Sequence, residues 1–112
     1  MGICLQKTCM KIIFSNLAVF KLEKLSKYLV EEFSVNSKNK FIKKLNSRIT
    51  TLQKNPELYP ASLIDQKLRK CVVTKHSSLL YEIHEDHIFI LNLIDNRQDI
   101  KSIHMEINKH FG

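Results

Sequence analysis

The sequence predicts an α+β domain in which a small, antiparallel-rich sheet packs against a hairpin of two helices. Between Lys67 and Asp99, three runs mix β-branched or aromatic residues with polar residues at roughly alternate positions, which is typical of an antiparallel meander with one buried face. Upstream, apolar residues recur every three or four positions along two long segments, as they do on the buried side of a helix. The expected order is therefore strand, helix, helix, three strands and a short C-terminal helix.

The first half of the chain should form a short strand and two amphipathic helices. Lys11–Phe14 is the expected strand, and Ser15 or Asn16 can cap the next helix, since either side chain accepts a bond from a free amide of the first turn. This helix should end near Phe33, and Asn36 should cap the second. Because the break is so short, we expect an antiparallel hairpin. The apolar stripes are Ala18, Leu22, Leu25, Leu29 and Phe33 in the first helix, and Phe41 or Ile42, Leu45, Ile49 and Leu52 in the second.

The second half should hold the sheet and a final helix. Asn55-Pro56 ends the second helix, because the residue before a proline disfavours helical backbone. A loop over residues 57–66 then leads to the sheet. The final helix should be capped by Asp99 and should dock through Ile103 and its apolar neighbours, since so short a helix is marginal alone. The strands are expected at Lys67–Lys75, Ser78–His84 and His87–Ile94.

Composition sets the class of protein. A chain of 112 residues with 44% hydrophobic residues has enough apolar material for one core and one domain. We expect residues 1–9 to be a disordered extension and residues 10–112 to form the domain. No apolar run is long enough to span a membrane, and three cysteines without a signal peptide indicate reduced thiols. These features predict a cytoplasmic protein without a membrane partner.

The positive charge is concentrated in the second helix. The chain has a formal charge of +7 and a pI of about 9.4, which favours a polyanionic target or an acidic partner. In the second helix the charge can be a solvated face, or it can be a binding surface for nucleic acid or an acidic protein. Its basic residues are Lys38, Lys40, Lys43, Lys44, Arg48 and Lys54.

In the order of its elements and in several local features, the chain resembles the RelE/ParE superfamily of bacterial toxin–antitoxin toxins. A leucine-rich first helix is followed by a second helix ending in Leu52-Gln-Lys-Asn-Pro-Glu57, and Leu68-Arg69 opens a strand. Leu79–Ile83 forms an apolar and aromatic strand, and the next strand ends near Asn96-Arg97-Gln-Asp99. The resemblance implies a toxin of a type II module, as in plasmid stabilization, that a cognate acidic antitoxin neutralises. Some members cleave messenger RNA on the ribosome, and others poison DNA gyrase.

RNA cleavage without a metal would need a base for the ribose 2′-hydroxyl, cations for the transition state and an acid for the leaving oxygen. The candidate catalytic residues are Arg69, Lys75, Tyr81 and Arg97. Tyr81 alternates with Leu79 and Ile83, so it can equally be a core residue. The candidate nucleic-acid-binding or target-binding residues are Lys40, Lys43, Lys44, Arg48, Arg69, Lys75 and Arg97. We expect no metal and no cofactor.

Two arginines at the margins of the meander suggest a clamp. Arg69 and Arg97 can together hold a phosphate or carboxylate, since each guanidinium offers paired donors. Alternatively each pairs with a nearby acid, Arg69 with Asp65 and Arg97 with Asp95 or Asp99.

The C-terminus favours one activity over the other. Many nuclease members of the superfamily carry a Tyr near the C-terminus, whereas this chain ends in His110-Phe111-Gly112. We therefore favour a ParE-like toxin that arrests growth through a target such as DNA gyrase. The alternatives are a RelE-like, ribosome-dependent mRNA interferase and a degenerate, non-toxic basic binding module.

Overall fold

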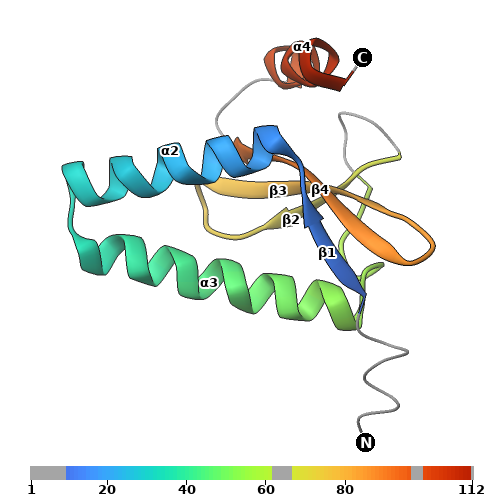
Figure 1. The fold of residues 1–112 in the computed structure, drawn as a ribbon, viewed down its shortest axis with the longest axis horizontal. Coiled ribbons are helices and arrows are strands. Elements are labelled where there is room, and N and C mark those ends of the chain that lie inside the picture. The colour runs from blue at the N-terminus through green and yellow to red at the C-terminus, as the bar shows by residue number, and fades with distance from the viewer. Residues whose placement is uncertain (1–9, 62–66, 97–99, 112) are drawn as a thin grey trace, which may run out of the picture.

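The computed structural model describes residues 10–61, 67–96 and 100–111. These residues form an α+β domain whose elements follow the expected order (Figure 1). The head at residues 1–9, Asp65, Arg97 and Asp99 lie outside the described residues. The elements are β1 (Lys11–Phe14), α2 (Asn16–Glu32), α3 (Val35–Lys54), β2 (Arg69–Val72), β3 (Ser77–Ile83), β4 (His87–Asp95) and α4 (Ile100–Phe111).

The four strands form one mixed sheet in the order β1-β4-β3-β2. The meander is antiparallel, as expected, and β1 adds to it in parallel beside β4, from Lys11 opposite His87 to Phe14 opposite Ile90. The register between β3 and β4 shifts at Leu80/Tyr81. Such a shift bends the strand and redirects its side chains.

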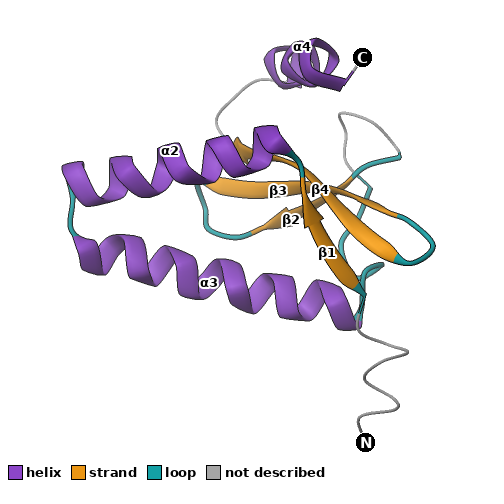
Figure 2. Ribbon diagram, viewed as in Figure 1, coloured by secondary structure: helices purple, strands orange, loops and turns teal. Residues whose placement is uncertain are grey.

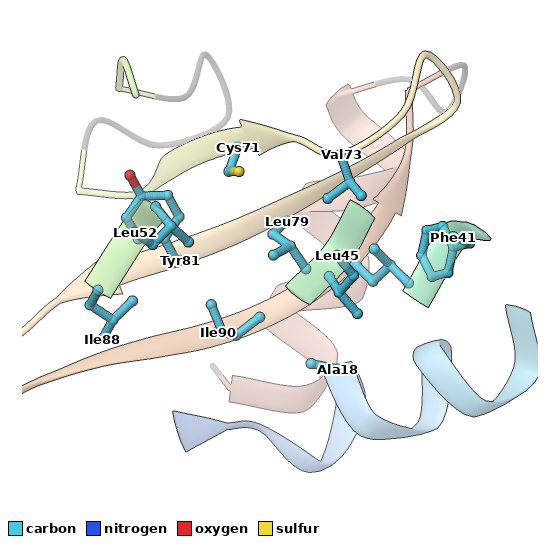
Figure 3. Close-up of a cluster of buried hydrophobic side chains, with 11 residues drawn as sticks. Ala18, Phe41, Leu45, Leu52, Cys71, Val73, Leu79, Tyr81, Ile88 and Ile90 are labelled. Atoms are coloured by element: carbon cyan, nitrogen blue, oxygen red, sulfur yellow. The ribbon is translucent and has the colours of Figure 1, made fainter. Parts of the chain in front are cut away.

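One face of the sheet packs against α2 and α3, which form the expected antiparallel hairpin (Figure 2). The helices contribute buried side chains from their predicted stripes, although Leu25 is only partly buried. Figure 3 shows these side chains gathered over the strands. The buried members are Ala18, Phe41, Leu45 and Leu52 from the helices, and Cys71, Val73, Leu79, Tyr81, Ile88, Ile90 and Leu93 from the β2–β4 region.

The opposite face of the sheet is also covered, so the expectation of one buried face is wrong. α4 lies over it and buries Ile103 in a second cluster, with Ile107 packed at its edge. Five successive residues of β3, from Ser77 to Tyr81, are buried as a result. A strand buried on both faces loses its alternation of polar and apolar residues. The other buried members of this cluster are Leu68, Leu80, Leu91 and Ile94.

The strands predicted at Ser78–His84 and His87–Ile94 are each within one residue of the observed bounds, and two other elements differ by two residues or more. Ser34, and not Asn36, caps α3, because its hydroxyl accepts a hydrogen bond from the amide of Ser37 at 3.1 Å. The strand predicted at Lys67–Lys75 is reduced to Arg69–Val72, because the amide of Val73 already bonds across to the Ser77 carbonyl at 2.9 Å and begins the turn.

The N-cap of α2 is Ser15, one of the two residues that the sequence predicted for this position. The Ser15 hydroxyl accepts a bond from the amide of Ala18 at 2.9 Å and donates to the carbonyl of Leu91 at 2.6 Å. It therefore stabilises the first turn of α2 and fastens that turn to β4.

Candidate functional site

An open groove of about 990 Å³ lies between α2, α3 and the end of the sheet formed by the β2–β3 turn and the end of β4. Its volume lies at the upper end of the range of small-molecule sites. The turn between β2 and β3 reaches between the two helices and forms one wall (Figure 2). Apolar side chains line much of the groove, and they are Leu25, Tyr28, Leu29, Phe33, Phe41, Leu93 and Ile94.

Lysines dominate the charge around this groove. Lys21 and Lys24 come from α2, Lys40 and Lys44 come from α3, and Asp95 is the acidic residue among the lining side chains. Lys21 is paired with Glu106 of α4. Within the described residues, no carboxylate lies within ion-pairing distance of Lys24, Lys40 or Lys44. The groove is therefore an apolar trough with a positive rim.

A network of hydrogen bonds holds the wall formed by the β2–β3 turn. The Asn96 side-chain amide donates to the carbonyls of Thr74 at 3.2 Å and Lys75 at 3.1 Å, and its oxygen accepts from the Ser78 hydroxyl. The amide of Asn96 also donates to the carbonyl of His76 at 2.9 Å. This end of β4 therefore positions Thr74 and His76, which line the groove, and leaves the Lys75 side chain exposed.

Arg69 lies at the other end of β2, away from Lys75. It is partly buried, and its guanidinium donates to the carbonyl of Tyr59 at 2.6 Å and, over a longer 3.4 Å, to that of Glu57. Arg69 pairs with Tyr81 at the start of β2, whereas Lys75 lies in the turn that follows Val72, so the two cations are at opposite ends of this strand. Arg69 fixes the segment after α3, and its proposed partner Arg97 lies outside the described residues.

Tyr81 sits beside Arg69 in the sheet and is fully buried. Its hydroxyl points out of the core cluster (Figure 3) and donates to the carbonyl of Pro56 at 2.7 Å. Burial raises the pKa of the Tyr81 phenol far above its usual value, and Cys71 adds to the shift, while the charge of Arg69 opposes it. A phenol held neutral in this way anchors the end of α3 and is poorly suited to act as a base near pH 7.

A second polar cluster lies at the edge of the sheet next to α3. Arg48 is exposed, and its Nε donates to the carbonyl of Val72 at 3.2 Å, so it caps the end of β2. Burial raises the pKa of the Cys71 thiol, which makes it a weaker nucleophile at neutral pH. Burial likewise raises the pKa of the neighbouring Tyr59 phenol.

The β3–β4 hairpin carries two histidines whose rings stack 4.6 Å apart. His84 contacts Glu82 at 3.0 Å, and His87 contacts Asp86 at 2.7 Å. The hydrogen bond from His87 lowers the pKa of the exposed Asp86 carboxyl. In the portion of the chain that is described, three or more His, Cys, Asp or Glu side chains nowhere gather as a metal-binding group.

Three lysines of α3 are among the predicted target-binding residues. Lys40 and Lys44 line it, whereas Lys43 is exposed without lining it. Sequence reasoning missed Lys21 and Lys24. The available signal was their spacing of three on α2 next to the stripe residue Leu25, which places both along one edge of the apolar face.

Every helix in the described part of the chain is too short or too polar to cross a bilayer. None of the curated proteins matches the sequence. Several solved structures share the fold, including the following two. One is described as a chromosomal ParDE toxin–antitoxin system from P. aeruginosa, with a TM-score of 0.66 and 14% identity over 79% of this chain and 97% of that one. The other is the solution structure of a conserved hypothetical protein, HP0894, from Helicobacter pylori, with a TM-score of 0.53 and 18% identity over 80% and 97% of the two chains.

The sequence itself matches a known family over most of its length. The match covers residues 12–100, from the second residue of β1 to the start of α4, and so includes both helices of the hairpin and all of the sheet except Lys11. The chain belongs to the family of ParE toxins of type II toxin–antitoxin systems, parDE.

Proposed function

We propose that the protein arrests bacterial growth by acting on DNA gyrase, in the manner expected of a ParE-like toxin. The family match carries this proposal. The geometry of the candidate catalytic residues supports it over RNA cleavage. Tyr81 is buried and bonded to a main-chain carbonyl, and Arg69 is bonded to two, at the end of β2 away from Lys75. An acid, a base and a cation must converge on one phosphate for metal-free cleavage.

The groove supports a second part of the proposal, namely that an acidic antitoxin segment binds there. An amphipathic segment can place its apolar side chains against Tyr28, Leu29 and Phe33, and its carboxylates beside Lys40 and Lys44. Opposite charges at such an interface increase the association rate and orient the partner. The antitoxin is then expected to bind quickly at low salt and more slowly as ionic strength rises.

Induced expression in bacteria tests the activity. Growth should stop, DNA damage should be signalled, and messenger RNA should remain intact until growth has stopped. Cleavage of messenger RNA at specific positions, without DNA damage, would instead support the mRNA interferase. Normal growth with a stably folded protein would support a non-toxic binding module.

Charge reversal tests the binding site. The Lys40→Glu/Lys44→Glu variant should weaken antitoxin binding and reduce its dependence on salt, because two cations of the groove become anions. Lys27→Glu/Lys43→Glu is the matched control, since both of its lysines are exposed and neither lines the groove. Equal losses of affinity in both variants would mean that only net charge matters, and would remove the groove from the binding site.

A further inference from the structure

Lys21 takes part in two surfaces at once. It lines the groove between the helices, and its ammonium contacts both carboxylate oxygens of Glu106 in α4, at 2.9 and 2.8 Å. The two side chains are only 22% and 25% exposed. An ion pair with this degree of burial is less screened by solvent than a surface pair. The ammonium of Lys21 therefore belongs both to the lining of the groove and to the contact with α4.

α4 acts as a cover for one face of the sheet. Ile103 is 3% exposed and packs on Leu80 and Leu91, both fully or almost fully buried. Figure 1 shows that α4 lies on the α2 side of the molecule, away from α3. A helix of 12 residues is marginal in water by itself, so α4 depends on these contacts for its structure.

A buried polar contact fixes the shared ion pair. Asn92 of β4 is fully buried beneath α4, and its side-chain amide donates to Glu106 at 3.1 Å. Within the described residues, the Asn92 side-chain oxygen has no hydrogen-bond partner. Because a buried amide is costly unless its bonds are made, Asn92 depends on Glu106 staying in place. The position of Glu106 thus links the sheet, α4 and Lys21.

We propose that filling of the groove and docking of α4 are antagonistic, with Lys21 as the shared element. A carboxylate of an acidic segment in the groove competes with Glu106 for Lys21, and loss of that cation loosens α4 from the sheet. The inference rests on the proposed acidic occupant of the groove. The coupling is reciprocal, so a docked α4 weakens binding of the acidic segment by the same factor.

The test measures binding and α4 protection in the same samples. The probe is a capped amphipathic peptide with leucines on one helical face and glutamates elsewhere. Amide hydrogen exchange of Ile100–Phe111 should speed up about fivefold or more when the peptide saturates the wild-type protein, while Ser77–Ile83 should stay protected. Glu106→Gln, which frees Lys21, should bind the peptide about fivefold tighter and show faster α4 exchange without peptide.

Glu23→Gln is the matched control, because it makes the same change of charge at an exposed position on α2. It should leave both readouts at the wild-type values. If Glu106→Gln folds poorly, Lys21→Gln provides the second variant, because it leaves the bond from Asn92 to Glu106 in place. It should speed up α4 exchange without peptide and make that exchange insensitive to the peptide, since residue 21 is no longer a cation.

The outcomes separate this inference from the proposed function. Binding that depends on Lys40 and Lys44, with α4 exchange unchanged by peptide and equal affinities for Glu106→Gln and Glu23→Gln, would overturn the coupling alone. No binding of the peptide to the wild-type groove would overturn both the acidic occupant and the coupling.

Discussion

Replacing Tyr81 by phenylalanine separates a structural tyrosine from a catalytic one. The ring keeps its place in the core, and only the hydroxyl that donates to the Pro56 carbonyl at 2.7 Å is lost. Such a bond contributes about 0.5–1.5 kcal/mol net. Pro56 is only partly buried, so water can reach its carbonyl. We therefore expect a loss of about 1 kcal/mol, which lowers the melting temperature by about 4 °C in a domain of this size.

The same variant should change the alkaline limit of stability. The folded-state pKa of Tyr81 is raised above its ordinary value by burial, so the neutral phenol contributes stability that is fully present below about pH 10. That contribution is lost as pH rises from there through the folded-state pKa, because the unfolded chain releases its proton first. Tyr59 and Cys71 have raised pKa values as well. Both residues are present in Tyr81→Phe too, so the difference in stability between the two proteins isolates the contribution of Tyr81.

Urea unfolding of both proteins from pH 8 to pH 11, together with a growth assay, provides the readout. Wild type should lose more stability than Tyr81→Phe above about pH 10, and Tyr81→Phe should still arrest growth. A folded Tyr81→Phe protein that has lost all growth arrest would refute the structural role. If Tyr81→Phe lost more than about 3 kcal/mol of stability, the bond from the hydroxyl would contribute more than is expected for an acceptor that water can reach.

The remaining predictions concern packing, the arginines and the head. Leu45→Ala should cost about 2–5 kcal/mol in urea unfolding, and Leu25→Ala less, because Leu25 is only partly buried; equal costs would contradict this packing. Arg69→Ala should cost about 1 kcal/mol through its lost bond to a carbonyl, and an unchanged melting temperature would argue against that role. Arg97→Ala should abolish growth arrest without changing stability, if Arg97 contacts the target. A chain starting at Met10 should keep its melting temperature and activity, since Gln53 bonds both main-chain groups of Met10, and a large drop would show that the head packs on the domain.

Local sequence patterns predicted most of the fold. The stripes through Leu45 and Leu52 and the three β-rich runs depend on periodicities of one element, which a sequence displays directly. The second buried face could not be read in this way. Leu80 and Ile103 come together on the second face only after the whole chain has folded. The pattern around Ile103 predicts that the last helix docks, but not on which face of the sheet.

The candidate site was predictable to a smaller degree for the same reason. Lys40 and Lys44 were recognised from the charge of one helix. The pairing of Lys21 with Glu106 joins residues 85 positions apart, and the bond from Tyr81 to Pro56 joins residues 25 apart. Polar partners at such separations depend on how the elements pack, so sequence pattern alone does not identify them.

A cleavage assay with purified DNA gyrase tests the central claim most directly. Supercoiled plasmid, gyrase and ATP are incubated with the protein, and the reaction is stopped with detergent and protease to reveal trapped DNA breaks. The account predicts linear plasmid that requires both gyrase and the protein and disappears when the cognate antitoxin is added. Absence of gyrase-dependent breaks, with cleavage of ribosome-bound messenger RNA by the same preparation, would contradict it.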